Sequence, residues 1–144
     1  MTKKYPTTDT YYWHNENPSN RKTGDCVLRS IAVATNQTWD KVLDDLVEIA
    51  HKRHIMIDDS GCYGRYLESL GWVKMKQPRK FDNTKYTGKE FCKYLEKNGY
   101  KGPILAHIGG HHITVFNKTA SKAYRCCDIW DCTDGCIGNW WCIQ

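Results

Sequence analysis

Apolar side chains recur every three or four positions over much of the first hundred residues, a spacing typical of helices with one buried face. The pattern predicts four helices. Their apolar stripes run from Val27 to Ala34 in a helix that begins near Asp25, from Trp39 to Ala50, from Tyr63 to Leu70, and from Phe91 to Leu95 in a helix that opens at Thr87.

The residues that flank these stripes support the predicted ends. Thr38 stands where its hydroxyl can cap the second helix. Thr87 followed by Glu90 has the capping-box pattern at the start of the fourth. Gly71 and the pair Asn98-Gly99 are placed to end the third and fourth helices.

After Pro103 the pattern changes from a helical period to alternation, which is typical of strands. Residues 103–108 predict a strand, Gly109-Gly110 a turn, and residues 112–117 a second strand. A hairpin loop over 118–121, a third strand over 122–130 and a fourth over 138–143 complete the pattern. Helices followed by an antiparallel sheet indicate an α+β domain.

The length of the chain, 144 residues, fits one domain with its own hydrophobic core. Residues 1–22 are polar and predict an irregular N-terminal arm, which Tyr11, Tyr12 and Trp13 would anchor to the rest. Residues 23–144 are expected to form the single folded domain.

Composition places the chain among ordinary globular proteins, with 40% hydrophobic and 26% charged residues. No apolar run is long enough to span a membrane, and the first residues lack the apolar segment of a signal peptide. We therefore expect a cytoplasmic protein whose eight cysteines are reduced. A disulfide framework is the alternative that a secreted chain would favour.

The net charge of +5 raises the question of a nucleic-acid partner. Its densest stretch runs from Lys74 to Lys80. No recognition motif accompanies this stretch, so a solvated loop is favoured over a nucleic-acid interface. The charge would still favour an acidic partner surface.

The first candidate for chemistry is Cys26, which stands where a turn enters the first predicted helix. Unpaired amides and the helix dipole at such a position favour a thiolate over a thiol. The same amides can donate to an oxyanion that forms beside the sulfur. Arg29, one turn later, could add positive potential or anchor Asp25. A small core residue is the alternative interpretation of Cys26.

A histidine and an acid complete the arrangement. His112 enters a predicted strand directly after the Gly109-Gly110 turn, a position that can hold an imidazole rigidly at a cleft. With Asn117 opposite residue 122 or 123, His112 would lie opposite Cys127 or Asp128. A carboxylate there can accept the imidazole N–H and set its tautomer.

These motifs resemble those of the papain-like cysteine peptidase superfamily, in particular small phage or bacterial proteins of the peptidase C39-like and NlpC/P60-like groups. The resemblance lies in four segments, residues 24–32, 110–114, 128–132 and 138–141. It implies a papain-like fold and a hydrolase that cleaves a peptide, isopeptide or related amide bond in a protein or peptide substrate, without a cofactor or metal.

The resemblance also implies roles. Cys26 would be the nucleophile that forms a thioester, His112 the general base, and Asp128 the residue that orients His112. Such folds usually place an amide side chain upstream of the nucleophile for the oxyanion hole, and Asn20 is the candidate here. His111 and Asp131 remain open as substitutes for His112 and Asp128.

Other functions stay open on the same residues. An acyltransferase or transglutaminase would use the same triad with an amine in place of water, and a binding protein would leave the triad idle. Residues 24–30 are also similar to the nucleophile motif of OTU deubiquitinases. That motif usually has an aromatic residue where this chain has Leu28 and an acid where it has Thr23.

A zinc site is the remaining alternative for the cysteines near the C-terminus, which are Cys126, Cys127, Cys132, Cys136 and Cys142. They do not form paired C-x-x-C motifs, and adjacent Cys126 and Cys127 would point to opposite faces of a strand. His51, His54 and Cys62 are a second candidate ligand set, for which a solvated helix end is the favoured interpretation.

Overall fold

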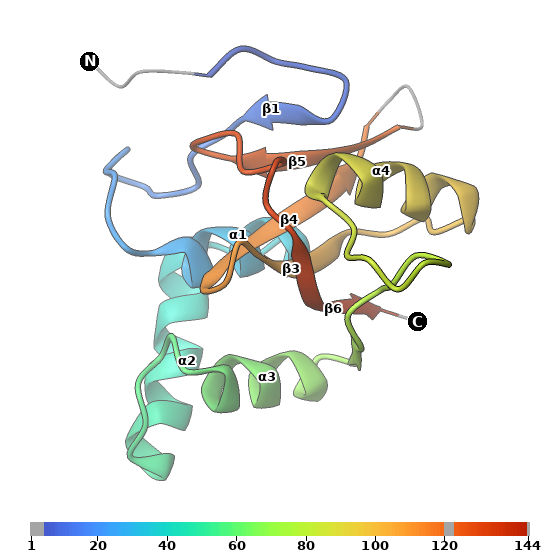
Figure 1. Cartoon of the computed structure of the whole chain (residues 1–144). Helices are drawn as coiled ribbons and strands as arrows, with labels where there is room; N and C mark the ends of the chain where they lie inside the picture. The colour runs from blue at the N-terminus through green and yellow to red at the C-terminus, as the bar shows by residue number, and fades with distance from the viewer. Residues whose placement is uncertain (1–4, 120–122, 144) are drawn as a thin grey trace.

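The computed structural model describes residues 5–119 and 123–143 of the chain (Figure 1). In this part of the chain, four helices and six strands follow one another in the order β1 (Tyr11–Trp13), α1 (Cys26–Thr35), α2 (Trp39–Arg53), α3 (Ser60–Ser69), β2 (Trp72–Met75), α4 (Gly88–Lys97), β3 (Ile104–Ile108), β4 (His112–Lys118), β5 (Tyr124–Asp128) and β6 (Ile137–Ile143). The strands form one sheet in the order β1-β5-β4-β3-β6-β2. All neighbours are antiparallel except β1 and β5, which are parallel. The prediction of an α+β domain is confirmed.

The four predicted helices are all present, and local signals explain their ends. The Thr38 side chain accepts a hydrogen bond from the Lys41 amide at the start of α2. Thr87 and Glu90 form both halves of the capping box at the start of α4. Gly71, with φ of +90°, carries the chain out of α3 through a conformation that other residues adopt at a cost.

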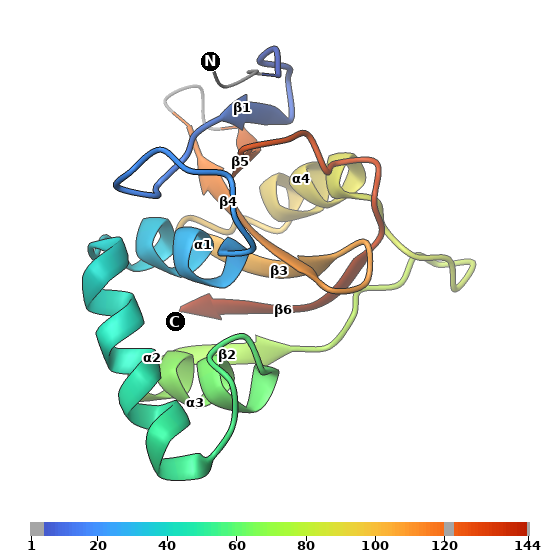
Figure 2. The same ribbon diagram turned by 90° about the vertical axis from the view of Figure 1, so that its left-hand side faces the viewer.

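Helices cover both faces of the sheet, so the core has two parts. Side chains that alternate along the strands divide between them: Leu105, Ile113, Val115 and Trp141 pack against α1, α2 and α3, whereas Ile104, Phe116, Cys126 and Trp140 pack against α4. Figure 2 shows α1 crossing one face of the sheet, with α4 on the other side. On its face of the sheet α1 packs against β4, and Arg29 of α1 reaches Asp128 at the end of β5.

Two strands fall where the sequence predicts none. The arm expected to be irregular over residues 1–22 contains β1, whose Tyr11 is fully buried and whose partner is Cys126 on β5. The basic connection expected from Lys74 instead begins inside β2, an edge strand that pairs with β6. Both pairings join segments that are far apart in the sequence, so no local pattern indicates them.

The C-terminal strands follow the prediction with shorter or longer ends. β5 ends at Asp128 rather than residue 130, and β6 begins at Ile137. The loop predicted over 118–121 and the start of the third strand at residue 122 fall largely on residues 120–122, which lie outside the described residues, as do residues 1–4 of the arm.

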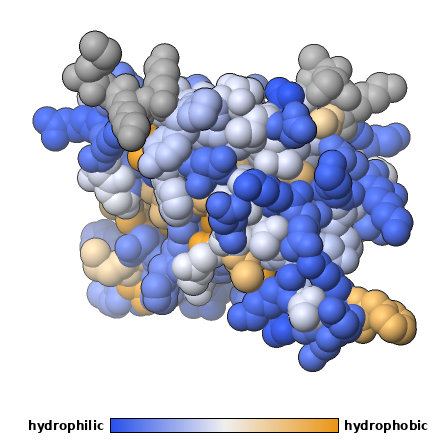
Figure 3. Space-filling model, turned by 45° about the horizontal axis from the view of Figure 1, so that its top comes forward, coloured by the Kyte–Doolittle hydropathy of each residue, from blue (hydrophilic) through white to orange (hydrophobic). Residues whose placement is uncertain are grey.

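The face of the molecule seen in Figure 3 is mostly hydrophilic, with smaller hydrophobic areas. Among the described residues, no helix combines the length and apolar character needed to cross a bilayer.

Candidate active site

Cys26 is the first residue of α1 and is only partly buried. Asp25 occupies the N-cap position but makes no side-chain hydrogen bond to the first turn. Its carboxylate instead accepts hydrogen bonds from Asn17, Arg29 and Trp39. The first amides of α1 are therefore left to interact with a negative charge at Cys26, as the dipole of the helix favours.

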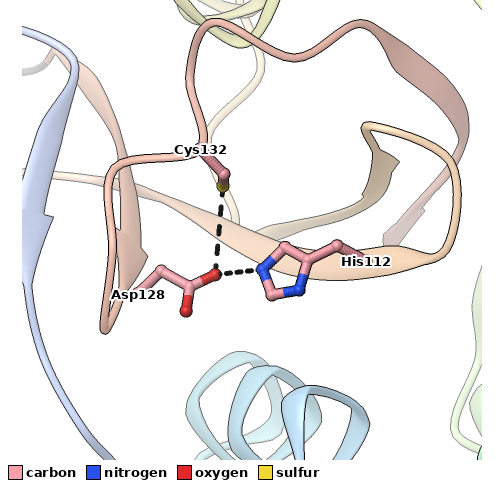
Figure 4. Close-up of side chains that lie close together, drawn as sticks. All are labelled: His112, Asp128 and Cys132. Carbon is pink, nitrogen blue, oxygen red and sulfur yellow. Dashed lines mark hydrogen bonds and ion pairs between the residues drawn. The ribbon is translucent and has the colours of Figure 1, made fainter. Parts of the chain in front are cut away.

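His112 is the first residue of β4 and links Cys26 to Asp128. Its Nε2 lies 2.7 Å from Oδ2 of Asp128, and Figure 4 shows the other ring nitrogen on the side of the ring away from Asp128. His112 also lies close enough to Cys26 to lower the pKa of its thiol, and the thiol in turn raises the pKa of His112. Because Nε2 is engaged by the carboxylate, Nδ1 is the ring atom that remains for the sulfur. Sulfur, imidazole and carboxylate thus form one continuous chain of interacting groups.

The strand register that brings Asp128 to His112 differs from the prediction. Asn117 lies opposite Arg125 rather than residue 122 or 123, and Val115 lies opposite Cys127. His112 therefore has no directly opposite partner on β5. Thr114, two residues after His112, lies on the same face of β4. Its Oγ1 donates to Oδ2 of Asp128 at 2.7 Å, so the carboxylate lies between Thr114 and His112 and bonds to both.

A buried arginine holds the carboxylate from its other side. Nη1 of Arg29 lies 2.9 Å from Oδ1 of Asp128, and Nε lies 2.7 Å from Oδ1 of Asp25. All three side chains are buried, with 8%, 3% and 4% exposure for Arg29, Asp128 and Asp25. The expectation that Arg29 anchors Asp25 is confirmed, and its second bond, to Asp128, was not predicted.

This arrangement shifts the pKa values of the chain of groups toward the charged forms. Burial alone would raise the pKa of Cys26, but His112, the Ile113 amide and Arg29 together hold it below its usual value. Burial likewise opposes the charged imidazole, yet Asp128 and the two neighbouring thiols raise the pKa of His112 to about 11. Burial also acts against the Asp128 carboxylate, whose pKa His112, Arg29 and Thr114 keep low. A thiolate beside an imidazolium is the state these contacts favour.

A second thiol lies behind the His112–Asp128 pair. Cys132 Sγ is 4.0 Å from Oδ2 of Asp128 (Figure 4). It is also 3.6 Å from Sγ of Cys126, and both cysteines are buried. Within the described residues, His112, Asp128 and Cys132 are the group of three donors close enough to hold a metal ion. Both oxygens of Asp128 already have donors from the protein, so hydrogen bonds account for this cluster as it stands.

The other cysteines considered for zinc are scattered. Cys126 and Cys127 point to opposite faces of β5, into different parts of the core. Cys136 is exposed. Cys62 is buried in contact with the Leu46 carbonyl, whereas His51 and His54 are exposed and do not join it in a three-donor group of the described chain. All eight cysteines are free thiols.

A cavity of about 410 Å³ has Cys26 in its wall. Its walls come from the turn before α1, the start of α3, the end of β3 and the turn into β4. The residues that line it are Gly24, Cys26, Val27, Asp58, Ser60, Tyr63, His107, Gly110 and His111. A carbonyl group bound in this cavity would lie next to the sulfur.

The remaining predicted residues occupy different places. His111 is exposed on the rim of the cavity, and the carboxylate of Asp131 caps a local turn by accepting from Thr133. Asn20 is exposed with its side chain near Asn15, and it does not line the cavity. The structure thus brings His112 and Asp128, rather than His111 and Asp131, into contact, and it does not bring Asn20 to Cys26.

Trp130 lies against the outer side of the imidazole, with ring centroids 5.2 Å apart. Its side chain is partly exposed, so it covers one face of His112 against solvent while leaving the cavity open. An aromatic cover of this kind favours a strong His112–Asp128 hydrogen bond by keeping water from it.

Comparisons with known proteins do not add a relative. No family model matches the chain, and neither the curated proteins nor the solved structures contain a match to it.

Proposed function

We propose that the chain is a cysteine-dependent hydrolase that cleaves a peptide, isopeptide or related amide bond, on a papain-like domain. The observation that carries this proposal is the continuous chain from the Cys26 sulfur through His112 to Asp128, at the mouth of a helix and beside an open cavity. A merely structural cysteine requires neither the imidazole nor the cavity.

The first half of the reaction forms a thioester. The Cys26 thiolate attacks the carbonyl carbon of the bound amide, and the carbonyl oxygen becomes an oxyanion. His112, protonated at Nδ1, gives this proton to the amide nitrogen as the C–N bond breaks, so the amine leaves neutral. Asp128 and Arg29 keep the imidazole in position throughout, because both are buried and rigidly bonded.

The second half returns the enzyme to its starting state. His112, now neutral, takes a proton from a water molecule that attacks the thioester carbon. The C–S bond breaks, the acid product leaves, and the Cys26 thiolate again faces an imidazolium. If an amine attacks in place of water, the same residues catalyse acyl transfer.

A thiolate enzyme of this kind suits a reducing compartment, and we propose a cytoplasmic location for that reason. The papain-like assignment accounts for the chain order of the site: the nucleophile at a helix start, the histidine on a strand and the acid on the next strand.

Selective alkylation tests the proposal. The protein is treated with a substoichiometric amount of iodoacetamide at mildly acidic pH, and the modified cysteines are identified by peptide mapping. We expect Cys26 to carry nearly all of the label, because its pKa is lowered and it is only partly buried, whereas burial raises the pKa of Cys62, Cys92, Cys127 and Cys142. The pKa of Cys132 is also lowered, to about 7, but this thiol is 3% exposed and out of reach of the reagent. Uniform labelling, or labelling confined to the exposed Cys136, would contradict the proposal.

A further inference from the structure

The described groups at Cys26 leave one catalytic role without a side chain. The tetrahedral intermediate carries its charge on the former carbonyl oxygen, and hydrogen-bond donors aimed at that oxygen supply much of the rate enhancement in acyl transfer. Asn20 lies away from the cavity. The backbone amides at the start of α1 can donate to the oxyanion from the side of Cys26. Any second donor to the oxyanion has to come from the cavity wall that faces Cys26.

That wall presents Tyr63 from α3 and His107 from β3, both of which line the cavity. The Tyr63 hydroxyl and Nε2 of His107 are directly hydrogen-bonded. Trp141 packs edge-on against both rings, with centroid distances of 5.9 and 5.1 Å, and fixes their orientation. Tyr63 and Cys26 line the same cavity, close enough for the charge of Cys26 to raise the pKa of the Tyr63 hydroxyl.

The strand register places this pair on the same face of the sheet as Cys26. His107 lies opposite Ile113 in the β3–β4 ladder, and Ile113, Tyr63 and Cys26 pack in the same part of the core. Cys26, Tyr63 and His107 all line the cavity, whereas His112 does not. A carbonyl carbon attached to the sulfur and extending into the cavity therefore meets the Tyr63–His107 pair there, while His112 acts on the sulfur from outside the cavity.

We infer that the Tyr63 hydroxyl is an oxyanion donor of the site, and that His107 is its positioning residue. This inference rests on the proposed function. When His107 carries its proton on Nε2, it donates to the Tyr63 oxygen, and the hydroxyl proton turns toward the oxyanion. No bond is made or broken in this contact, and the proton stays on Tyr63.

Both Tyr63 and His107 are uncharged near neutral pH, as a neutral hydrogen-bond donor to the oxyanion requires. Burial and the nearby charge of Cys26 raise the pKa of Tyr63 to about 12, so its hydroxyl keeps its proton near neutral pH. Burial, Lys74 and His111 lower the pKa of His107, which therefore stays neutral. A neutral donor beside the thiolate stabilises the new charge without neutralising the nucleophile.

Two probes of Cys26 separate this role from thiolate formation. Alkylation by iodoacetamide displaces iodide at a saturated carbon and forms no oxyanion, whereas acylation by p-nitrophenyl acetate passes through a tetrahedral oxyanion. For Tyr63→Phe we expect the acylation rate to fall about 10²- to 10³-fold while the alkylation rate of Cys26 changes less than about twofold. Cys26→Ala supplies the background reaction of the other thiols.

Tyr66→Phe is the matched control, because Tyr66 lies on the same helix, is equally buried and loses hydrogen bonds to Asp45 and Gln37. We expect it to leave both rates unchanged. If Tyr63→Phe unfolds, the pair His107→Gln and His107→Leu carries the test: glutamine retains an N–H near Nε2 and should keep most of the acylation rate, and leucine should not.

The outcomes distinguish this inference from the proposed function. Selective alkylation of Cys26 together with unchanged acylation in Tyr63→Phe would overturn the role of Tyr63 and leave the nucleophile intact. Equal loss of both rates in a folded variant would show that Tyr63 only shapes the cavity. A wild-type Cys26 that reacts with neither probe would overturn both.

Discussion

Replacing Arg29 by methionine removes the cation that two buried carboxylates share. Asp25 and Asp128 are 4% and 3% exposed, and each has an Arg29 nitrogen within 3 Å. Removing one partner of a buried ion pair costs about 3–5 kcal/mol, because the remaining charge stays buried without compensation. Methionine has a similar length and fills most of the space, so little of this loss would come from a cavity.

Urea unfolding at pH 7 measures the effect. We expect the free energy of unfolding to fall by about 3–5 kcal/mol, which for a domain of this size lowers Tm by on the order of 10 °C. Arg65→Met is the control, since Arg65 is exposed on α3, and it should change stability by less than about 0.5 kcal/mol.

The loss of unfolding free energy in Arg29→Met should depend on pH. In the wild type the pKa values of Asp25 and Asp128 are lowered in the folded state, so their contribution is present above the unfolded pKa of about 3.9 and is lost as pH falls below it. In Arg29→Met, burial raises the folded pKa of these groups above that value, and the variant gains from their protonation as pH falls. The deficit should therefore narrow between pH 7 and pH 5. A loss below about 1 kcal/mol, or a deficit that does not change with pH, would refute the buried ion-pair network.

Two further substitutions test other parts of the account. Asp128→Asn removes the charge that keeps His112 protonated. In stopped-flow or quenched labelling, the alkylation rate of Cys26 at pH 6 should therefore fall about tenfold or more, and the rate at pH 9 should change little. The control Asp131→Asn should leave both rates unchanged, and an equal effect of the two substitutions would contradict the assignment of Asp128 as the acid. Gly88→Ala would place a Cβ 2.8 Å from Cα of Thr133 and 2.9 Å from Cδ1 of Ile108, at a destabilisation of about 1–3 kcal/mol in urea unfolding. Gly64→Ala, on α3 with open space around its Cβ, should be neutral or stabilising, and a Gly88→Ala protein as stable as this control would show that α4 does not pack as described.

The helices could be predicted because their signals are local. Thr38 and the Thr87–Glu90 pair lie within one turn of the ends they define, and the apolar stripe of α2 is read from fifteen consecutive residues. Strand β1 could not be predicted from the sequence. Its three residues form a strand only because β5, more than a hundred positions later, offers a free edge. The predicted register of β4 on β5 is wrong by two or three residues, because the register depends on how many residues the connecting turn contains.

The candidate site divides in the same way. A cysteine at a helix start, a histidine after a Gly-Gly turn and an acid on the next strand can each be recognised from neighbouring residues. The contacts that hold these residues in place cannot be recognised from the sequence. Arg29 and Asp128 are 99 positions apart in the chain, and Tyr63 and His107 are 44 positions apart. Tyr63 fits the apolar stripe of α3, and His107 sits within an apolar strand, so the sequence presents both as core residues. Only their shared position at the cavity separates them from the core.

The rate of Cys26 alkylation as a function of pH, in the wild type and in His112→Ala, tests the pairing of sulfur and imidazole most directly. The lowered pKa of Cys26 and the raised pKa of His112 predict a wild-type rate that rises at a lower pH than the rate of an ordinary thiol. In His112→Ala the rate should rise only near the ordinary thiol pKa of about 8.5. Two identical profiles, each rising near that value, would contradict the account.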